Sequence, residues 1–301
     1  MMNFTARARP LATLLCVLAL LASMVSLAIG TSLAKHLFAV VGAEGTTVLR
    51  VGFAAIILLA LYRPWTKPLD RGRGVLIAVY GTTLGFMNFL FYCALRTIPL
   101  GLAVAIEFIG PLAVALLASR RAQDFVWIGF AVLGLALLMP ISGPTSKLDP
   151  VGIAFALGAG VCWALYIVTG QRVGKANGGQ AVALGMVVAA LVVAPFGAIN
   201  ASVALDDKRL LLQSVGVAIL SSALPYSLEM VALRDLPRQT FGVLLSLEPV
   251  ICALAGLAFL DEHLTVQQWT AIACVITASA GSMASLARAT KSNSPNVTLA
   301  P

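Results

Sequence analysis

Three acidic residues inside apolar stretches are the first sign of chemistry in this sequence. Of its 12 acidic residues, only Glu107, Glu229 and Glu248 lie well inside such stretches. A charged carboxylate at the centre of a bilayer costs about 2.5–3.5 kcal/mol on insertion scales, so these side chains should face a protein interior. A carboxyl group that titrates near neutrality there can bind and release a proton in each cycle. We therefore predict substrate or proton binding at these positions, and above all at Glu107 and Glu248, which lie near the middle of their stretches.

Each acid also has a structural interpretation. Glu107 and Glu248 each lie close to a proline, and their carboxyl groups would then bond to backbone groups that the proline leaves free. Glu229 lies about one turn from the cytoplasmic end of its stretch, where it would pair with Arg234 or extend to the membrane surface. The sequence alone leaves both interpretations open.

Basic and neutral polar residues supply possible partners for the acids. Lys35 closes the first apolar stretch and Arg50 lies about one turn inside the second, both toward the outer side. An amino acid carries a carboxylate and an ammonium group, so Arg50 together with Glu107 or Glu248 would suit it. Alternatively, both cations extend outward to lipid headgroups. Further residues at helical spacings are predicted to line a cavity, although aromatic ones also serve as packing or interface anchors: Asn88, Tyr92, Trp163, Tyr166, Ser222 and Tyr226.

The composition identifies the elements that must position these residues. Of the 301 residues, 60% are apolar and 11% are charged, which excludes an ordinary soluble domain. Apolar runs between charged, proline or glycine residues give ten candidate spans, each about twice the length of a barrel strand. Their ranges are 11–34, 45–62, 74–95, 98–119, 124–141, 150–171, 179–199, 211–233, 238–260 and 265–287. We predict an all-α polytopic membrane protein of ten transmembrane helices, without room for a soluble catalytic domain.

The distribution of positive charge predicts the orientation. With the amino terminus inside, the cytoplasmic ends of the spans carry 14 lysines and arginines and the outer ends carry five. This bias places both termini in the cytoplasm. It also accounts for the net charge of +8 without a nucleic-acid-binding surface.

An internal repeat divides the chain into two halves. The sequence ALRTIP at 94–99 returns as ALRDLP at 232–237, and the same offset of 138 residues places Pro111 on Pro249. Each half then holds five spans, and an odd number forces the second half to enter the membrane from the opposite side. Such inverted repeats are a transporter architecture with a substrate site near the midplane, which the two halves expose to either side in turn. A chance match of a short motif is the alternative.

The repeat gives the predicted organisation of the chain. A tail at 1–10, a first repeat at 11–142, a seam at 143–149, a second repeat at 150–287 and a tail at 288–301 follow from it. When the two halves are aligned with the offset of 138 residues, none of the three glutamates aligns with another acidic residue, whereas Pro111 aligns with Pro249. We infer that the prolines belong to the fold and the acids to the function.

Several segments carry a family resemblance over nearly the whole chain. The sequences PLGLAVAIEFIGPLAVAL at 99–116, LPYSLEMVAL at 224–233 and LEP at 247–249 resemble the inner-membrane threonine and homoserine exporters of the drug/metabolite transporter superfamily. The resemblance implies ten helices in two halves and a place in a bacterial-type inner membrane. It also implies efflux of small amino acids in exchange for protons.

Two other classes stay open beside this one. A transporter of the same superfamily for another metabolite or drug fits the repeat and the acids equally well. A polytopic membrane enzyme or receptor would need catalytic or metal-ligand clusters, and the only histidines are His36 and His263 on different outer loops. We therefore expect no enzymatic activity, no metal and no cofactor, and we name small amino acids, protons and the lipid bilayer as the partners.

Overall fold

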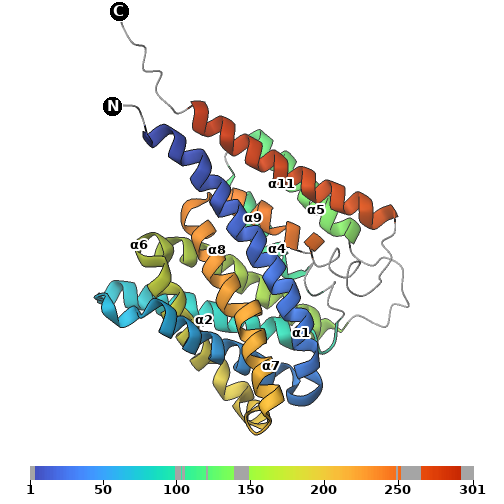
Figure 1. Cartoon of the computed structure of the whole chain (residues 1–301). Coiled ribbons are helices and arrows are strands. Elements are labelled where there is room, and N and C mark those ends of the chain that lie inside the picture. The colour runs from blue at the N-terminus through green and yellow to red at the C-terminus, as the bar shows by residue number, and fades with distance from the viewer. Residues whose placement is uncertain are drawn as a thin grey trace, which may run out of the picture.

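A computed structural model describes residues 4–98, 103, 106–119, 121–138, 149–248, 250–251 and 266–292. Throughout these ranges the ordered elements are helical and none is a strand (Figure 1). The elements are α1 (Phe4–Tyr62), η1 (Pro64–Thr66), α2 (Arg71–Ala94), α4 (Ile109–Ala118), α5 (Ala122–Leu138), α6 (Pro150–Ser202), η2 (Val203–Leu205), α7 (Lys208–Ala218), η3 (Ile219–Ala223), α8 (Leu224–Asp235), α9 (Arg238–Leu245) and α11 (Val266–Ser292). Residues 143–148 of the predicted seam and the outer parts of both tails lie outside these ranges.

Each of the ten predicted spans overlaps helical residues of the described chain, although parts of the spans at 98–119, 124–141 and 238–260 lie outside it. Six segments are long and apolar enough to cross a membrane: Ala12–Thr31, Val40–Thr66, Arg71–Ala94, Pro150–Lys175, Gly178–Leu205 and Lys208–Asp235. Shorter apolar helices cover Ile109–Ala118, Ala122–Leu137 and Trp269–Ser282. The predicted class of an all-α polytopic membrane protein is therefore confirmed.

The connections between some spans differ from the prediction. Residues 35–44 lie within α1, not in a loop, and the helix is interrupted there by Gly42 at φ 68°. Positive φ is readily adopted by glycine, which has no Cβ, so the break falls on this residue. Residues 172–178, predicted as a cytoplasmic loop, likewise continue α6. The apolar pattern marks membrane crossings but does not show where a helix continues beyond the hydrocarbon.

Aspartates begin three of the helices. The carboxylates of Asp70, Asp149 and Asp207 accept backbone N–H bonds from Arg73, Val151 and Arg209 at 2.9, 3.1 and 2.7 Å. These bonds satisfy donors that have no partner within the helix. At Asp149 the Val151 bond, with a further bond from Thr97, holds the pKa of the carboxyl below its usual value. These aspartates therefore serve the fold.

Glycines let the helices of the bundle approach closely. α2 and α6 pack along each other, and a Cβ on Gly81 of α2 would collide with the backbone carbonyl of Gly185 in α6. Gly170 and Gly185 also leave room for the ring of Tyr80, which is fully buried. This packing places one face of α2 against the interior of the protein.

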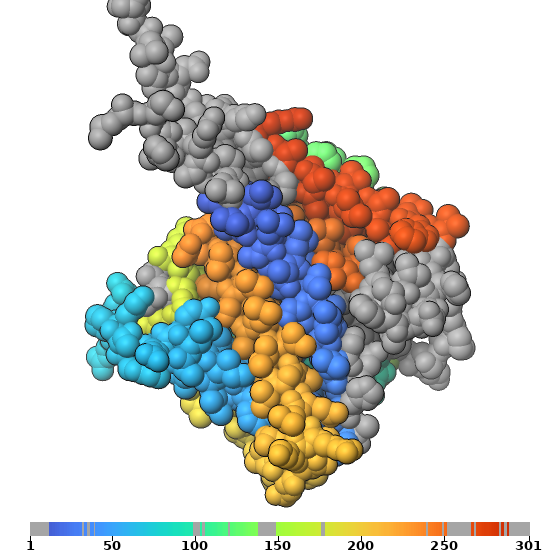
Figure 2. Space-filling view, in the orientation of Figure 1, coloured from blue at the N-terminus to red at the C-terminus, as the bar shows by residue number. Residues whose placement is uncertain are grey.

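α1 packs against helices from the distant carboxyl-terminal part of the chain. It contacts α7, η3 and α8, and Figure 2 shows these elements beside α1 on one face of the molecule. α5 and α11 pack along each other (Figure 1), and the indole N–H of Trp127 donates to the Ser285 hydroxyl at 2.9 Å. The interior enclosed by α1, α2, α6 and α8 contains the largest buried apolar cluster.

We expect Gly81→Ala to destabilise the protein, because its methyl group meets helix backbone that cannot move aside. The cost should be about 1–3 kcal/mol of unfolding free energy, as for other overpacked interiors. Gly52→Ala is the control, since no atom lies within 4 Å of its added Cβ. Thermal unfolding in detergent measures both. An equal midpoint for the two variants would contradict the close α2–α6 contact.

Candidate functional site

Arg50, in the second half of α1, lies at the centre of a buried polar network. Its side chain is only 4% exposed, and its two terminal nitrogens donate to the Tyr92 hydroxyl and the Asn88 amide oxygen on α2. The guanidinium carbon lies 5.1 Å from the centre of the Tyr92 ring. The Nε atom of Arg50 is buried and has no partner among the described residues. The interpretation that Arg50 extends to lipid headgroups is therefore wrong, because its donors are bonded inside the bundle.

Asn88 carries the network from α2 to α8. Its amide nitrogen donates to the Leu84 carbonyl at 2.8 Å and to the Tyr226 hydroxyl at 3.0 Å. The Tyr226 hydroxyl in turn donates to the Asn88 amide oxygen at 3.1 Å. Asn88 and Tyr226 are 4% and 6% exposed. A buried amide with its donors and acceptor in use is fixed in orientation, so Asn88 holds Arg50 and Tyr226 in place.

A group of tyrosines connects this network to Glu229. The rings of Tyr166 and Tyr226 meet edge to face at 6.0 Å, and the Tyr166 hydroxyl donates to the Glu229 carboxylate at 3.0 Å. The Tyr80 ring stacks on Tyr166 at 5.3 Å. Glu229 is 5% exposed and lies in the interior.

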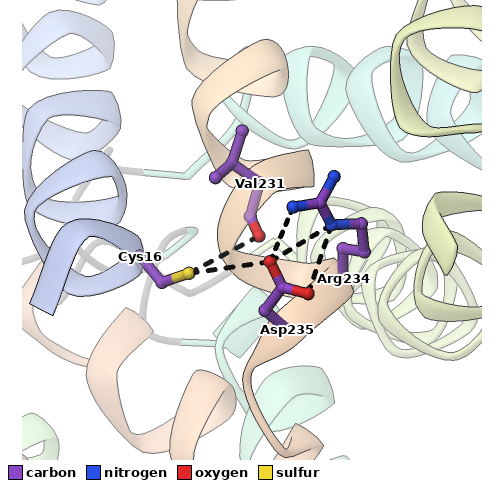
Figure 3. A network of polar contacts seen from close by, with 4 residues as sticks. All are labelled: Cys16, Val231, Arg234 and Asp235. Atoms are coloured by element: carbon purple, nitrogen blue, oxygen red, sulfur yellow. Dashed lines mark hydrogen bonds and ion pairs between the residues drawn. The ribbon is translucent and has the colours of Figure 1, made fainter. Parts of the chain in front are cut away.

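The partner proposed from the sequence for Glu229 is occupied elsewhere. Arg234 bonds with the carboxylate of its neighbour Asp235, 2.8 Å away (Figure 3). The Cys16 thiol of α1 lies 3.9 Å from the Val231 carbonyl and 4.0 Å from the same Asp235 carboxylate. The interpretation that Glu229 pairs with Arg234 or extends to the surface is therefore wrong.

Glu107 and Glu248 lie in the same interior. Glu107, 7% exposed, interacts electrostatically with Glu248 and with Arg50, and Glu248 also interacts with Glu229. The backbone of Glu107 lies so close to Gly160 in α6 that a Cβ on that glycine would collide with it. One carboxylate oxygen of Glu248 is buried without a partner among the described residues. The three glutamates therefore share an interior with Arg50, which is the one buried basic residue in the part of the chain that the structure describes.

Trp163 and Ser222, which were also predicted to line a cavity, are buried. Trp163 is buried and packs edge to face on Phe108, the residue after Glu107, with ring centres 5.3 Å apart. Ser222 is fully buried on η3. The side chain of Lys35 lies outside the described part of the structure, so its predicted role is not tested.

Two features of the interior escaped the sequence analysis. Leu84, Asn88 and Tyr92 follow Tyr80 by 4, 8 and 12 residues, and this helical spacing predicts that the four side chains share one face. Glu44, which lies only at the edge of an apolar run, is largely buried and forms an ion pair with Arg96. That pair joins α1 to the end of α2, and nothing in the local sequence indicates it.

The arrangement suits a small zwitterion. Among the described residues, the Arg50 guanidinium has one buried donor without a partner, and the Glu248 carboxylate has one buried acceptor without a partner. Buried donors and acceptors without partners carry a free-energy cost, and their presence in a protein calls for a specific explanation. A ligand with both a carboxylate and an ammonium group would satisfy both.

Comparison with known proteins identifies the family. The model of the EamA-like transporter family matches residues 150–284. The threonine/homoserine exporter RhtA of Salmonella typhimurium is 48% identical over 280 residues, which cover 93% of this chain and 95% of that protein. The chain belongs to the EamA-like transporter family. The exporter RhtA of Escherichia coli K12 is likewise 48% identical to this EamA-like transporter, over 272 residues that cover 90% of it and 92% of the relative.

A solved crystal structure shares the fold of this EamA-like transporter. The two superpose with a TM-score of 0.66 at 19% sequence identity, and the match covers 92% of this chain and 98% of the other. At that identity the likeness concerns the fold alone.

We expect Arg50→Lys to destabilise the transporter although it keeps the charge. A lysine ammonium is a single point that cannot reproduce the forked bonds to Asn88 and Tyr92. Leaving buried acceptors unpaired should cost about 1–3 kcal/mol of unfolding free energy. Thermal unfolding in detergent measures the loss.

Arg73→Lys is the matched control for this substitution. Arg73 is 54% exposed and pairs with Asp70 at the surface, where ion pairs contribute little. If Arg50→Lys unfolded at the same temperature as Arg73→Lys, Arg50 would not have the structural role described.

Proposed function

We propose that this chain exports small polar amino acids, threonine and homoserine among them, in exchange for protons. The observation that carries the proposal is the 48% identity, over 93% of the chain, to relatives named threonine/homoserine exporters. The buried network supports it independently, because its charges match those of an amino acid. The relatives are named as transporters and not as enzymes, and no step of the proposal requires bond chemistry on the substrate.

In the proposed site Arg50 binds the substrate carboxylate. Its Nε is free to donate, while Asn88 and Tyr92 hold its other two nitrogens. The substrate ammonium binds to Glu248 or Glu107, whose carboxylates interact across the same interior. Charge-assisted bonds of this kind orient the substrate backbone. They are the same for every amino acid and therefore do not select a side chain.

Transport would proceed by movement of two inverted repeats, residues 11–142 and 150–287, about this site. The Asn88–Tyr226 hydrogen bond supports the repeat, because the two residues are separated by 138 positions, the offset found in the sequence. Residues related by a twofold axis contact each other only on that axis. In addition, α1 packs on α7 and α8 while α6 packs on α2, as expected of reciprocal contacts between two equivalent halves.

The protons would be carried by the interior glutamates. A proton that enters from outside neutralises one carboxylate in the outward-facing state and leaves on the cytoplasmic side, so its entry is coupled to amino-acid exit. The excess of lysine and arginine at one set of span ends supports the prediction that both termini lie in the cytoplasm. The bacterial relatives and the apolar helices are consistent with residence in the inner membrane.

We expect Glu107→Gln and Glu248→Gln to reduce threonine export driven by a pH gradient at least tenfold, because an amide cannot exchange a proton in this range. Purified protein in proteoliposomes with labelled threonine and an imposed gradient measures this. Asp206→Asn, a change to an exposed acid, serves as the control and should transport at the rate of the unchanged protein. If both glutamine variants kept full gradient-driven export, proton coupling through these residues would be refuted.

A further inference from the structure

One serine in the carboxyl-terminal half differs from its neighbours in its hydrogen bonding. Four serines lie between Lys208 and Asp235. The hydroxyls of Ser214, Ser221 and Ser227 each donate to the carbonyl four residues earlier, at 2.6–2.7 Å. Ser222 is fully buried, and its hydroxyl has no partner among the described residues. A serine inside a helix commonly donates its hydroxyl to the backbone carbonyl four residues earlier. Ser222 does not, so its buried hydroxyl requires another explanation.

The local backbone around Ser222 is unusual. It lies in η3, a π-helical turn in which the backbone N–H of Leu224 donates to the Ile219 carbonyl, five residues earlier. Wider turns of this kind are rare, and they are frequently found at functional sites. The turn is held against α1, since the Ser26 hydroxyl donates to the Leu220 carbonyl at 2.7 Å. Gly30 lies so close to the turn that a Cβ there would collide with its backbone.

Ser222 on η3 lies at helical spacing from the residues of α8 that take part in the network. Tyr226 and Glu229 follow it by four and seven residues, which is helical spacing on one face. Tyr226 bonds to Asn88, and Glu229 accepts a bond from Tyr166. Both partners lie in the interior that contains Arg50. The free hydroxyl of Ser222 is therefore one turn from the residue that links α8 to Arg50.

We propose that Ser222 recognises the hydroxyl group of the transported amino acid. The inference rests on the proposed function and names its specificity determinant. Arg50 and the glutamates bind groups that every amino acid carries, so selection of a hydroxylated side chain needs another polar group. A serine hydroxyl both donates and accepts and can pair with a substrate hydroxyl. An apolar substrate of the same shape, such as valine in place of threonine, would leave Ser222 buried and unpaired.

The test is competition in proteoliposomes that contain the full-length protein. Exchange of labelled threonine is measured without a pH gradient, and unlabelled threonine and valine are compared as competitors. The ratio of their half-inhibiting concentrations gives the preference for the hydroxyl. In Ser222→Ala this preference should fall about three- to tenfold, because one hydrogen bond is lost for threonine and none for valine.

Ser221→Ala is the matched control. Ser221 is equally buried, but its hydroxyl bonds to the Val217 carbonyl of its own helix, so the preference should stay unchanged. Ser222→Cys keeps a side chain with only a weak donor and should lose preference as the alanine variant does. It serves as the second probe if that variant fails to fold.

The outcomes separate the inference from the proposed function. If threonine exchanges but Ser222→Ala or Ser222→Cys keeps the full preference, the role of Ser222 is refuted and the function stands. If valine competed as well as threonine in the unchanged protein, the role of Ser222 would also be refuted. If the unchanged protein exchanges no threonine at all, the proposed function itself is overturned, and this inference with it.

Discussion

Burial of a guanidinium group among apolar helices is the constraint on which the interior depends. Such a cation is tolerated only where the protein supplies acceptors, and Asn88 and Tyr92 supply them to Arg50 from adjacent turns of α2. Asn88 can do so only in the orientation that Tyr226 and the Leu84 carbonyl fix. The positions of α1, α2 and α8 are thereby set by a few directional bonds in addition to apolar packing, which in a membrane has little preference for one partner over another.

Small residues make this arrangement possible. Gly81 and Gly185 let α2 approach α6, and Gly110 and Gly160 let the segment after Glu107 do the same. This close packing surrounds the interior in which Arg50 is the one buried basic residue among those that the structure describes. Asn88 and Tyr226, the hydrogen-bonded pair on the proposed twofold axis, are different residues, with the asparagine in the first half and the tyrosine in the second. A symmetric fold can thus hold an asymmetric substrate, with its carboxylate on one side and its ammonium on the other.

Much of this could be predicted from the sequence, for identifiable reasons. Long apolar runs and the cost of a buried charge mark the ten spans and the residues Arg50, Glu107 and Glu229 without any knowledge of packing. Partners could not be predicted, because hydrogen bonds such as that from Tyr166 to Glu229 join residues 63 positions apart. The π-helical turn at Ser222 and the burial of Glu44 depend on contacts with α1 and α6 that no local pattern encodes. The helical continuation of α1 through residues 35–41 was missed for the opposite reason, since polar residues there ended the apolar run but not the helix.

The central claim is that Arg50 binds the carboxylate of a transported amino acid. Binding to the purified protein in detergent tests it most directly, with threonine compared against its methyl ester, which keeps the ammonium and hydroxyl groups but has no charged carboxylate. We predict saturable binding of threonine and a loss of at least tenfold in affinity for the ester. Equal affinity for the two compounds would show that the buried cation does not recognise the substrate carboxylate, and would contradict the account.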